Sequence, residues 1–461
     1  MRNAPAPTPS VSPTSAPPDA DRRPWVASYP PGVPADVPAP SEPIHVMLEV
    51  AARVYPDRPA LDFFGRRTTY GQLWGEVLVA ARALADRGVG RGSVVAIALP
   101  NCPQHVVAFY AVARLGGIVV EHNPTYGASQ FAHQLADCGA TCVIAWDKVA
   151  PVIAGVVDRA RVDVIAVDVS AALPVVQRLA LRLPVPKARR LRAELTGGAR
   201  AGIVGWQSLM DTRRTLDPAV RGPEVGDVAA LQYTGGTTGT PKGAVLTHAN
   251  LVVNAMQSVA WVPKLVLGEE VLYGALPFFH AFGLTLCLTV PARLGALLVI
   301  FPKFDVQMVL AAQRRVPGTF FPGVSPMFER LVNAAFPDDD GGADVGGVRR
   351  RGGGHRVDLT SFRHSICGAM ALPEPVARRW EVATGGMLIE GYGLTETSPI
   401  ALGNPASDAR RPGTLGLPFP GTDIRIANLD RPDVDVAEGE AGELWIRGPQ
   451  VFGGYWNRPE E

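Results

Sequence analysis

Short apolar runs alternate with helix-length amphipathic stretches from about residue 61 to residue 146, and this alternation restricts the possible folds more than any other feature. Three of the runs are typical of buried strands, at Ser93–Pro100, Gly116–Pro124 and Thr141–Trp146. Helical periodicity fills the intervals at 70–87, 105–115 and 128–138. Strands that alternate with helices of this length predict βαβ units and a mostly parallel sheet. A second α/β stretch begins near Asp227, and alternating runs after about Gly413 predict a small β-rich part.

Composition indicates a globular protein of several subdomains. The chain has 461 residues, and a prior of ~150 residues per domain suggests about three units. Apolar residues make up 47% of the chain, enough for large cores, and a formal net charge of +1 gives no reason to expect a nucleic-acid partner. The five cysteines are scattered without a CxxC pair, which argues against a disulfide framework or a structural zinc site and fits a reducing cytoplasm.

The first 42 residues are rich in Pro, Ala and Ser and show almost no apolar periodicity. Such a composition cannot bury a core, so we expect residues 1–42 to be disordered and a folded domain to span 43–461. The extension has no basic start followed by an apolar run, so it is not typical of a secretory signal. The most apolar later stretch, Leu284–Phe301, contains Pro291 and Arg293 and falls short of the ~20 residues that span a bilayer, so we expect a core segment.

Segment 174–195 mixes leucines with six basic residues and one acidic residue. One interpretation is an amphipathic basic surface that touches an anionic membrane. The alternative is a solvated face on a linker, interrupted by Pro184 and Pro186, and we favour this alternative on the sequence.

The most specific chemical signal is YTGGTTGTPKG, Tyr233–Gly243, which follows a predicted strand at Val228–Tyr233. Glycines let backbone N–H groups approach an anion closely, threonine hydroxyls add donors, and Lys242 adds a point charge. This combination predicts a polyphosphate-binding loop. It is not a Walker A loop, because Pro241 precedes the lysine, so we expect a hairpin-like flap rather than a loop that runs directly into a helix.

The loop resembles the phosphate loop of the adenylate-forming superfamily, which includes acyl-CoA synthetases, peptide-synthetase adenylation domains and luciferases. Further segments match the superfamily's motifs in order and spacing: NPTYGASQFAHQL (123–135), LPFFHAFG (276–283), CGAMALP (367–373), EGYGLTETSP (390–399) and GELWIRGPQVFGGYWNRPE (442–460). The resemblance covers about residues 45–461, and it is closest to bacterial long-chain fatty acid–CoA ligases.

The resemblance implies an α/β fold in which two parallel-rich subdomains form a layered αβαβα core beside a small β-rich part. ATP would lie where these parts meet, at the carboxyl ends of the strands. The implied reaction has two steps: a fatty acid carboxylate attacks the α-phosphate of ATP, and CoA then attacks the acyl-adenylate. ATP, Mg²⁺ and CoA are therefore expected.

Carried over residue by residue, the resemblance assigns the nucleotide to two motifs. The residues expected to bind the β- and γ-phosphates are Thr234, Gly235, Gly236, Thr237, Thr238, Gly239 and Lys242. The second motif supplies Glu390, Gly391, Tyr392, Gly393 and Thr395, of which Tyr392 would stack on adenine and Thr395 would contact the α-phosphate. Glu396 is the expected magnesium ligand, because a hard divalent cation prefers carboxylate oxygen. The residues expected to act in catalysis are Lys242, His280, Thr395 and Glu396.

The acyl side of the site is assigned in the same way. His280 lies among Phe278, Phe279 and Phe282, and the resemblance places it at the substrate carboxylate. Small residues are expected along the acyl path at Gly283, Gly323, Val324, Gly368 and Ala369. Space for an alkyl chain and simple backbone crowding would both explain small residues there.

The sequence departs from the superfamily pattern after the NRPE segment. Members continue with a TGD segment whose Asp holds the ribose, a hinge, and a small C-terminal domain with a lysine used in adenylation; here Glu461 is last and no lysine follows Lys303. Three hypotheses remain open: the large domain of a fatty acid–CoA ligase, a truncated relative that binds acyl chain or nucleotide without turnover, and a fatty acyl-AMP ligase that feeds a carrier protein. We expect a cytoplasmic protein, with contact to the inner membrane face, if any, through 174–195.

Overall fold

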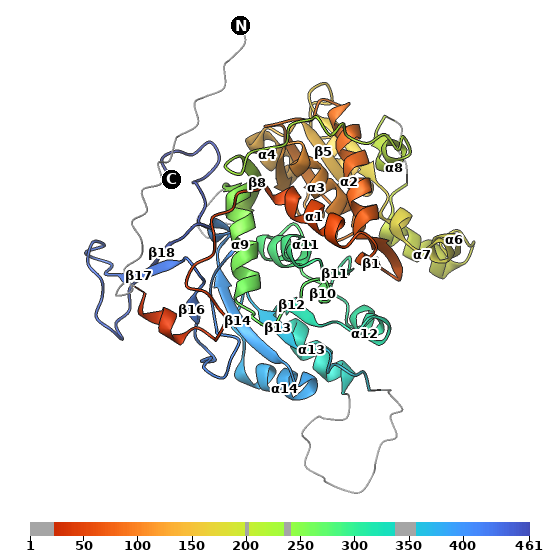
Figure 1. Ribbon diagram of the computed structural model, residues 1–461. Coiled ribbons are helices and arrows are strands. Elements are labelled where there is room, and N and C mark those ends of the chain that lie inside the picture. The colour runs from red at the N-terminus through yellow and green to blue at the C-terminus, as the bar shows by residue number, and fades with distance from the viewer. Residues whose placement is uncertain (1–22, 199–201, 235–240, 337–355) are drawn as a thin grey trace, which may run out of the picture.

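Two large twisted sheets and one two-stranded ribbon organise the chain, with helices between and outside the sheets (Figure 1). The structure is a computed structural model, and it describes residues 23–198, 202–234, 241–336 and 356–461.

The first sheet has seven strands in the order β7-β6-β5-β3-β4-β8-β9. Its strands are β3 (Val94–Ala98), β4 (Ile118–Glu121), β5 (Cys142–Trp146), β6 (Asp163–Val167), β7 (Val204–Gly205), β8 (Val228–Thr234) and β9 (Lys242–Thr247). All neighbours run parallel except β8 and β9. On β3, Val95 and Ile97 face one core while Val94, Ala96 and Ala98 face another, so both faces of the sheet are covered. The predicted strands within 93–146 are confirmed.

The second sheet has nine strands in the order β16-β15-β14-β13-β12-β10-β11-β1-β2. Its strands are β1 (Pro59–Phe63), β2 (Arg66–Thr69), β10 (Val271–Gly274), β11 (Leu297–Ile300), β12 (Phe320–Gly323), β13 (His364–Cys367), β14 (Met387–Gly393), β15 (Ile400–Gly403) and β16 (Leu417–Pro418). The centre is parallel, and the antiparallel pairs lie at the two ends, β1–β2 and β14–β15–β16.

Helices form three layers around these sheets. One buried core joins the inner helices to both sheets: α1 (Ile44–Val54), α2 (Tyr70–Ala85), α3 (Pro103–Arg114), α9 (His248–Ala260) and α11 (Val290–Leu294). The outer face of the seven-stranded sheet is covered by α4 (Ala128–Cys138) and α5 (Ala150–Ala154). The outer face of the nine-stranded sheet is covered by α12 (Val306–Arg315), α13 (Ser325–Ala335) and α14 (Glu374–Thr384). The αβαβα arrangement expected from the sequence is therefore confirmed.

The sequence explains the start of α2 and the burial of the apolar stretch at 284–301. The α2 helix starts at a capping box, in which the Thr69 hydroxyl accepts from the Gln72 amide and the Gln72 side chain accepts from the Thr69 amide. The apolar stretch Leu284–Phe301 forms the π-helical turn η4 (Leu284–Thr289), α11 and β11, and nearly all of it is buried. This confirms that the stretch is a core segment.

The expectation of disorder for residues 1–42 is wrong for 23–42, whereas 1–22 lie outside the described residues. Residues Pro24–Ser28 form the 3₁₀-helix η2. The Tyr29 hydroxyl donates to the Pro418 carbonyl at 2.6 Å, and its ring packs edge-on against Trp261. Arg23 bonds the carboxylates of Asp36 and Asp423. The segment has no core of its own, so its composition looks disordered, but distant parts of the chain supply its partners.

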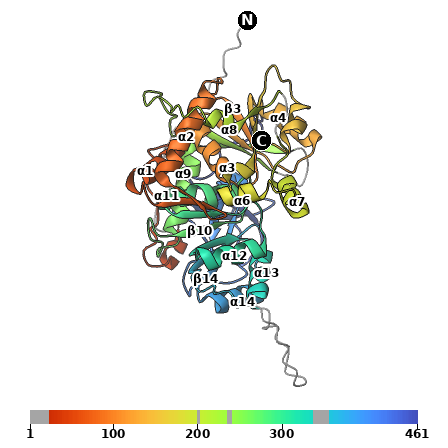
Figure 2. The ribbon, with the colours of Figure 1, turned by 90° about the vertical axis from the view of Figure 1, so that its right-hand side faces the viewer.

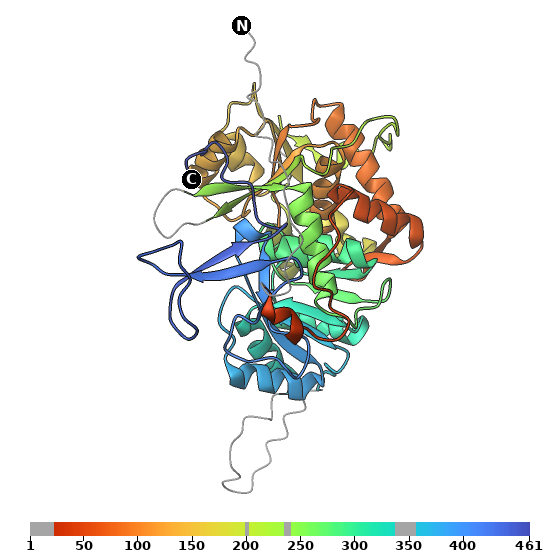
Figure 3. The same ribbon diagram turned by 60° about the vertical axis from the view of Figure 1, so that its left-hand side comes forward.

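The last part of the chain forms an antiparallel ribbon of β17 (Asp423–Ala427) and β18 (Glu443–Arg447), which confirms the expected β-rich part. Figure 3 shows this ribbon on the same side of the molecule as the β8–β9 hairpin. After β18 the chain returns to β9, where Tyr455 bridges to Ala244. This return brings the C-terminal residues to the base of the phosphate loop.

Segment 174–195 forms two short helices, α6 (Val175–Ala180) and α7 (Pro186–Leu195), at one edge of the molecule. They project from the right-hand side in Figure 1 and face the viewer in Figure 2. They follow the 3₁₀-turn η3 (Val169–Ala172) and precede α8 (Trp206–Met210). Among the described residues, no helix combines the length and apolar character needed to cross a bilayer.

Candidate active site

The carboxyl ends of three parallel strands place several of the expected site residues together. Cys367 on β13 lies in register with Gly323 on β12 and with Glu390 on β14. Just beyond, the Gly368 amide donates to the Gly323 carbonyl at 3.2 Å. Parallel strands end at one edge of a sheet, so Val324, Ala369 and the 390–393 segment share this edge, where open α/β sheets bind ligands.

A tight turn between β14 and β15 presents Thr395 and Glu396. A Cβ atom added to Gly393 would lie 1.8 Å from the Pro399 carbonyl oxygen, so only glycine allows the two segments to approach this closely. The Leu394 amide donates both to the Pro399 carbonyl and to the Thr397 hydroxyl. Thr395, Glu396 and Thr397 form a single 3₁₀-turn, η5, which holds the first two residues at a fixed angle to the strand.

Glu396 is held by the returning C-terminal segment. Its Oε1 accepts a 2.6 Å hydrogen bond from the Tyr455 hydroxyl, and its carbonyl accepts from the Phe452 amide at 2.8 Å. Burial, followed by the contact with Glu396, raises the pKa of Tyr455 to about 12. Tyr455 therefore stays protonated and donates, which leaves Oε2 of the carboxylate for another partner.

Lys242 lies on the other side of Tyr455. It opposes Thr234 across the mouth of the β8–β9 hairpin. Its ammonium is 5.3 Å from the centre of the Tyr455 ring and forms an ion pair with Glu461. The antiparallel strands confirm the hairpin on either side of the loop, but Gly235, Gly236, Thr237, Thr238 and Gly239 lie outside the described residues. Within the described part of the chain, Tyr455 thus connects the expected phosphate-binding cation to the expected metal ligand.

His280 is positioned by the loop that follows β10. The Nδ2 of buried Asn101 donates to the Gly274 and Leu276 carbonyls, and its Oδ1 accepts from the Phe278 amide. The His280 Nδ1 accepts from the Phe282 amide at 3.3 Å, at the start of α10 (Ala281–Gly283). Neighbouring side chains partly desolvate the imidazole and lower its pKa, although the residue is exposed to solvent. His280 is therefore a neutral, oriented ring at the edge of the site.

The 276–283 segment and η4, which follows it directly, contact the other parts of the site. The Thr285 hydroxyl donates to the Ser398 carbonyl at 2.8 Å. A Cβ atom added to Gly368 would lie 2.9 Å from the Phe282 ring. These contacts bring the His280 segment, the end of β13 and the turn after β14 into one region, as the sequence motifs predicted.

Close packing accounts for the three glycines expected along the acyl path, against backbone at Gly283 and against aromatic rings at Gly323 and Gly368. A Cβ atom on Gly283 would lie 1.9 Å from the Pro277 carbonyl oxygen, and one on Gly323 would lie 3.1 Å from the Phe328 ring. Gly368 is crowded by Phe282, as described above. Ala369 adopts a left-handed conformation with φ of 65° and is exposed, while Val324 is half-buried. The chain's own packing thus explains the three glycines.

A large apolar cavity of about 980 Å³ lies beside this region. Phe279, Met308 and Met327 line it on the side of the nine-stranded sheet, and α6 and α7 line it on the opposite side. Residues Gly283, Gly323, Val324, Gly368 and Ala369 are not on its wall. Phe279 directly precedes His280, so the cavity reaches the motif expected to bind the carboxylate. A volume of this size suits an extended apolar ligand.

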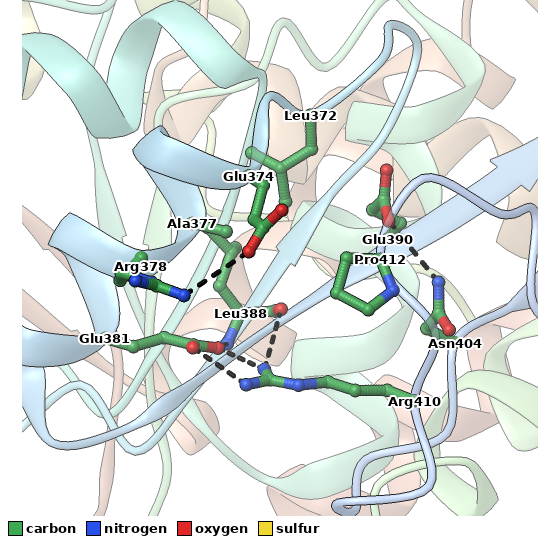
Figure 4. Close-up of a pocket in the computed structure, with 10 residues that line it drawn as sticks. All are labelled: Leu372, Glu374, Ala377, Arg378, Glu381, Leu388, Glu390, Asn404, Arg410 and Pro412. Carbon is green, nitrogen blue, oxygen red and sulfur yellow. Dashed lines mark hydrogen bonds and ion pairs between the residues drawn. The ribbon is translucent and has the colours of Figure 1, made fainter.

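The Glu390 carboxylate lies on a different, smaller pocket of about 160 Å³ (Figure 4). Its Oε2 accepts from the Gly413 amide at 3.0 Å and from Asn404 Nδ2 at 3.4 Å. Across this pocket, Arg410 pairs with Glu381 and bonds the Leu388 carbonyl. Most polar groups here bond one another, which indicates a structural role for the Glu390 side chain. The Glu390 side chain points into this smaller pocket, while its backbone belongs to β14, the strand that also carries Tyr392.

The site suits a magnesium ion carried by a nucleotide better than a resident metal centre. No group of three His, Cys, Asp or Glu side chains that could hold a metal occurs among the described residues. Glu396 offers one carboxylate with a free oxygen, and Mg²⁺ commonly takes one or two carboxylates together with phosphates and water. The residues present therefore fit Mg²⁺ bound with ATP.

Two residues of the site had no role in the sequence analysis. Tyr455 lies within the quoted GYWNRPE stretch, but nothing in that stretch indicates contact with Glu396, 59 residues away. Asn101 is a polar residue three positions after the buried strand β3, and that placement near the carboxyl end of a parallel strand was the available signal.

Comparison with known proteins adds independent findings. Residues 48–456 match the family model described as AMP-binding enzyme. A long-chain-fatty-acid–CoA ligase of Bacillus subtilis is 34% identical over 443 residues, which cover 95% of this chain and 75% of that protein. One from Yersinia pestis is 35% identical over 456 residues, which also cover 95% of this chain and 75% of that protein. A feruloyl-CoA synthase of Amycolatopsis is 30% identical over 410 residues, covering 89% of this chain and 70% of that protein.

Solved structures agree on the fold. A long-chain-fatty-acid-CoA ligase from Archaeoglobus fulgidus superposes with a TM-score of 0.74 at 22% identity and covers 93% of this chain and 79% of its own. An anthranilate CoA ligase in complex with anthranoyl-AMP also gives 0.74 at 22% identity, with shares of 92% and 73%.

Proposed function

Because the chain belongs to the family of AMP-binding enzymes, we propose that it activates a long-chain fatty acid with ATP and transfers the acyl group to CoA. Its similarity to ligases of that name over 95% of its length supports this choice of reaction. The adenylate-forming large domain is assigned to residues 43–461, and the reaction to the cytoplasm.

One observation favours a long alkyl substrate over a small or aromatic acid. The apolar cavity of about 980 Å³ reaches Phe279, next to His280, and its far wall comes from α6 and α7. Each methylene that enters such a cavity contributes ~0.8 kcal/mol. A fatty acid could therefore place its carboxylate at His280 and its tail in the cavity.

The chain's own residues have distinct tasks in this proposal. Tyr392 and the 390–393 backbone bind the adenosine, Thr395 contacts the α-phosphate, and Thr234 and Lys242 bind the outer phosphates with the loop between them. His280 orients the fatty acid carboxylate towards the α-phosphate. Glu396 holds Mg²⁺, which when bound neutralises phosphate charge. Fixed donors and charges of this kind act without reorganising during the reaction.

Lys242 is suited to exchange partners on nucleotide binding. Its ion pair with Glu461 is partly exposed, with about a third of each side chain accessible. Exposed pairs of this kind contribute little, typically ~0–1 kcal/mol. A polyphosphate carries more charge than one carboxylate and would replace Glu461 at low cost.

The test is product formation by the purified chain with Mg-ATP, CoA and a carboxylic acid. We expect AMP and acyl-CoA in equal amounts with palmitate, and at least ten-fold less with ferulate. If pyrophosphate forms while the acyl group stays on AMP, the chain feeds a different acceptor and CoA is not its co-substrate. A preference for ferulate would reject the assignment of the cavity to an alkyl tail.

A further inference from the structure

The α6–α7 segment, residues 174–195, exposes an unusual number of apolar side chains. Val175, Val176 and Leu179 on α6 are 60%, 78% and 55% exposed, and Leu183 and Leu191 follow at 54% and 41%. Single exposed apolar residues are common on protein surfaces and need no explanation. With Val185 at 46%, six within 17 consecutive residues form a patch, which marks an interaction surface.

The same segment carries a strong positive charge. Its exposed basic residues are Arg182, Lys187, Arg189, Arg190 and Arg192. Among the described residues, none of these five forms an ion pair or a side-chain hydrogen bond, and Glu194 is the single acidic residue of the segment. Elsewhere on the surface many arginines are paired, as Arg87 is with Asp163. The unpaired cations are therefore free to meet an anionic partner.

The segment also forms one wall of the large cavity. Leu181, Ala188 and Leu195 turn their buried or half-buried side chains to it, and the exposed Leu183 and Leu191 line it as well. Three of the chain's five lysines line the same cavity, Lys148, Lys187 and Lys303, and all three are exposed. The cavity thus meets solvent beside the exposed patch, with cations around it.

We propose that the α6–α7 segment docks on an anionic membrane surface and that the cavity takes its fatty acid directly from the bilayer. The proposal rests on the fatty acid activation proposed above, and it names the surface that supplies that site. Helices with exposed Leu and Val on one part and Arg and Lys on the other lie at the lipid–water interface. The lysines at the cavity would then meet the fatty acid carboxylate as the tail leaves the lipid.

Charge and apolar exposure together favour a membrane over an acidic protein. An acidic protein would neutralise the arginines, but Val175, Val176 and Leu179 would need a matching apolar surface. A bilayer with anionic headgroups satisfies both requirements at once. Each Lys or Arg near such a surface increases the affinity of the protein for the membrane about five-fold, and salt weakens this attraction.

The first experiment measures co-sedimentation of the chain with vesicles, without ATP or fatty acid. Vesicles contain phosphatidylcholine alone or phosphatidylcholine with phosphatidylglycerol. We expect binding to the anionic vesicles that weakens at high salt, and at least ten-fold weaker binding by both Val176→Asp/Leu179→Asp and Arg189→Glu/Arg190→Glu. Val382→Asp on α14 and Arg431→Glu in an exposed turn are matched controls and should bind like the parent. No binding, or equal loss in the controls, would overturn the proposal.

The second experiment separates delivery from chemistry. Pyrophosphate release is measured with palmitate dissolved in anionic vesicles and with water-soluble octanoate. In both double variants, the rate of pyrophosphate release should fall at least five-fold with vesicle-bound palmitate. With octanoate the rate should equal that of the parent, because none of the four substituted residues lines the cavity. Equal rates of variants and parent on both acids would overturn the delivery route. A parent inactive on both acids would reject the proposed function, while the vesicle assay would still decide the docking.

Discussion

The Tyr455 hydroxyl donates a 2.6 Å hydrogen bond to Oε1 of Glu396 and so joins the C-terminal segment to the turn after β14. The same tyrosine ring lies 5.3 Å from the Lys242 ammonium. One aromatic residue therefore contacts both charged groups to which we assign the phosphates and the metal. Carboxylates that bind metals are commonly oriented by such outer hydrogen bonds.

Removing this hydrogen bond should weaken the response to magnesium. In Tyr455→Phe, we expect the Mg²⁺ concentration for half-maximal pyrophosphate release to rise by roughly 10-fold, within the range known for outer-shell partners. The ring over Lys242 remains, so ATP affinity without metal should stay unchanged. Trp445→Phe alters an exposed aromatic side chain on β18 that contacts neither Glu396 nor Tyr455, and serves as the control. An unchanged magnesium response in Tyr455→Phe would show that the hydroxyl does not orient a metal ligand.

Narrowing the apolar cavity should shorten the preferred substrate. Met308 on α12 lines the cavity, and Met308→Trp would fill part of it. We expect the activity on palmitate to fall by at least ten-fold and the activity on hexanoate to stay within two-fold, since a short tail needs less of the volume. Met210→Trp enlarges a residue that lines a separate cavity and should not change this ratio. An equal loss on both acids in Met308→Trp would remove the cavity as the tail site.

Asn101 should matter for stability as well as for the position of His280. Its side chain bonds three backbone groups of the 274–278 loop, and it is buried. Asn101→Ala leaves these groups unpaired, so we expect a loss of about 2–4 kcal/mol in the free energy of unfolding. Urea denaturation measures this loss. Asn428→Ala removes an asparagine that caps an exposed turn and should cost less than ~1 kcal/mol.

Buried His122 should make the fold sensitive to mild acid. Its Nδ1 bonds the Gln134 side chain at 2.7 Å, its Nε2 is buried without a partner, and burial lowers its pKa to about 4. In the unfolded chain this imidazole therefore binds a proton near pH 6.5, whereas in the folded chain it binds one only near pH 4. The free energy of unfolding is unaffected by His122 above pH 6.5 and decreases by roughly 3 kcal/mol as the pH falls from 6.5 to 4.

The measurement for His122 is the free energy of unfolding across this pH window. His122→Gln should flatten the dependence by that amount, whereas His133→Gln, which changes an exposed histidine, should leave it unchanged. An identical pH dependence in His122→Gln would show that this imidazole is not the titrating group.

Local pattern was sufficient to predict much of the fold. The strands β3, β4 and β5 face a core on both sides, and their short continuous apolar runs are visible in the sequence. The αβαβα order and the gathering of the motifs came from resemblance, and the structure and comparisons agree with it. Residues 23–42 show the limit of composition, since their order depends on Trp261, Pro418 and Asp423, far away in sequence.

Side-chain contacts across long sequence distances could not be predicted. Nothing near Glu396 indicates that Tyr455 will reach it, and nothing near α6 or α7 indicates that they form a wall of the cavity next to Phe279. The sequence could not decide whether the glycines at 283, 323 and 368 leave space for an alkyl chain or avoid crowding, until the distances to Pro277, Phe328 and Phe282 were known.

Carboxylate-dependent pyrophosphate release from Mg-ATP tests fatty acid activation most directly. With the purified chain we expect release that requires palmitate and falls by ~100-fold in Glu396→Ala, because that variant loses the carboxylate assigned to the metal at the reacting phosphates. Glu390→Gln, whose side chain lies on the smaller pocket, should release pyrophosphate at close to the parent rate. Pyrophosphate release that does not depend on palmitate would contradict the proposed reaction. Release at an unchanged rate in Glu396→Ala would contradict the site assigned to it.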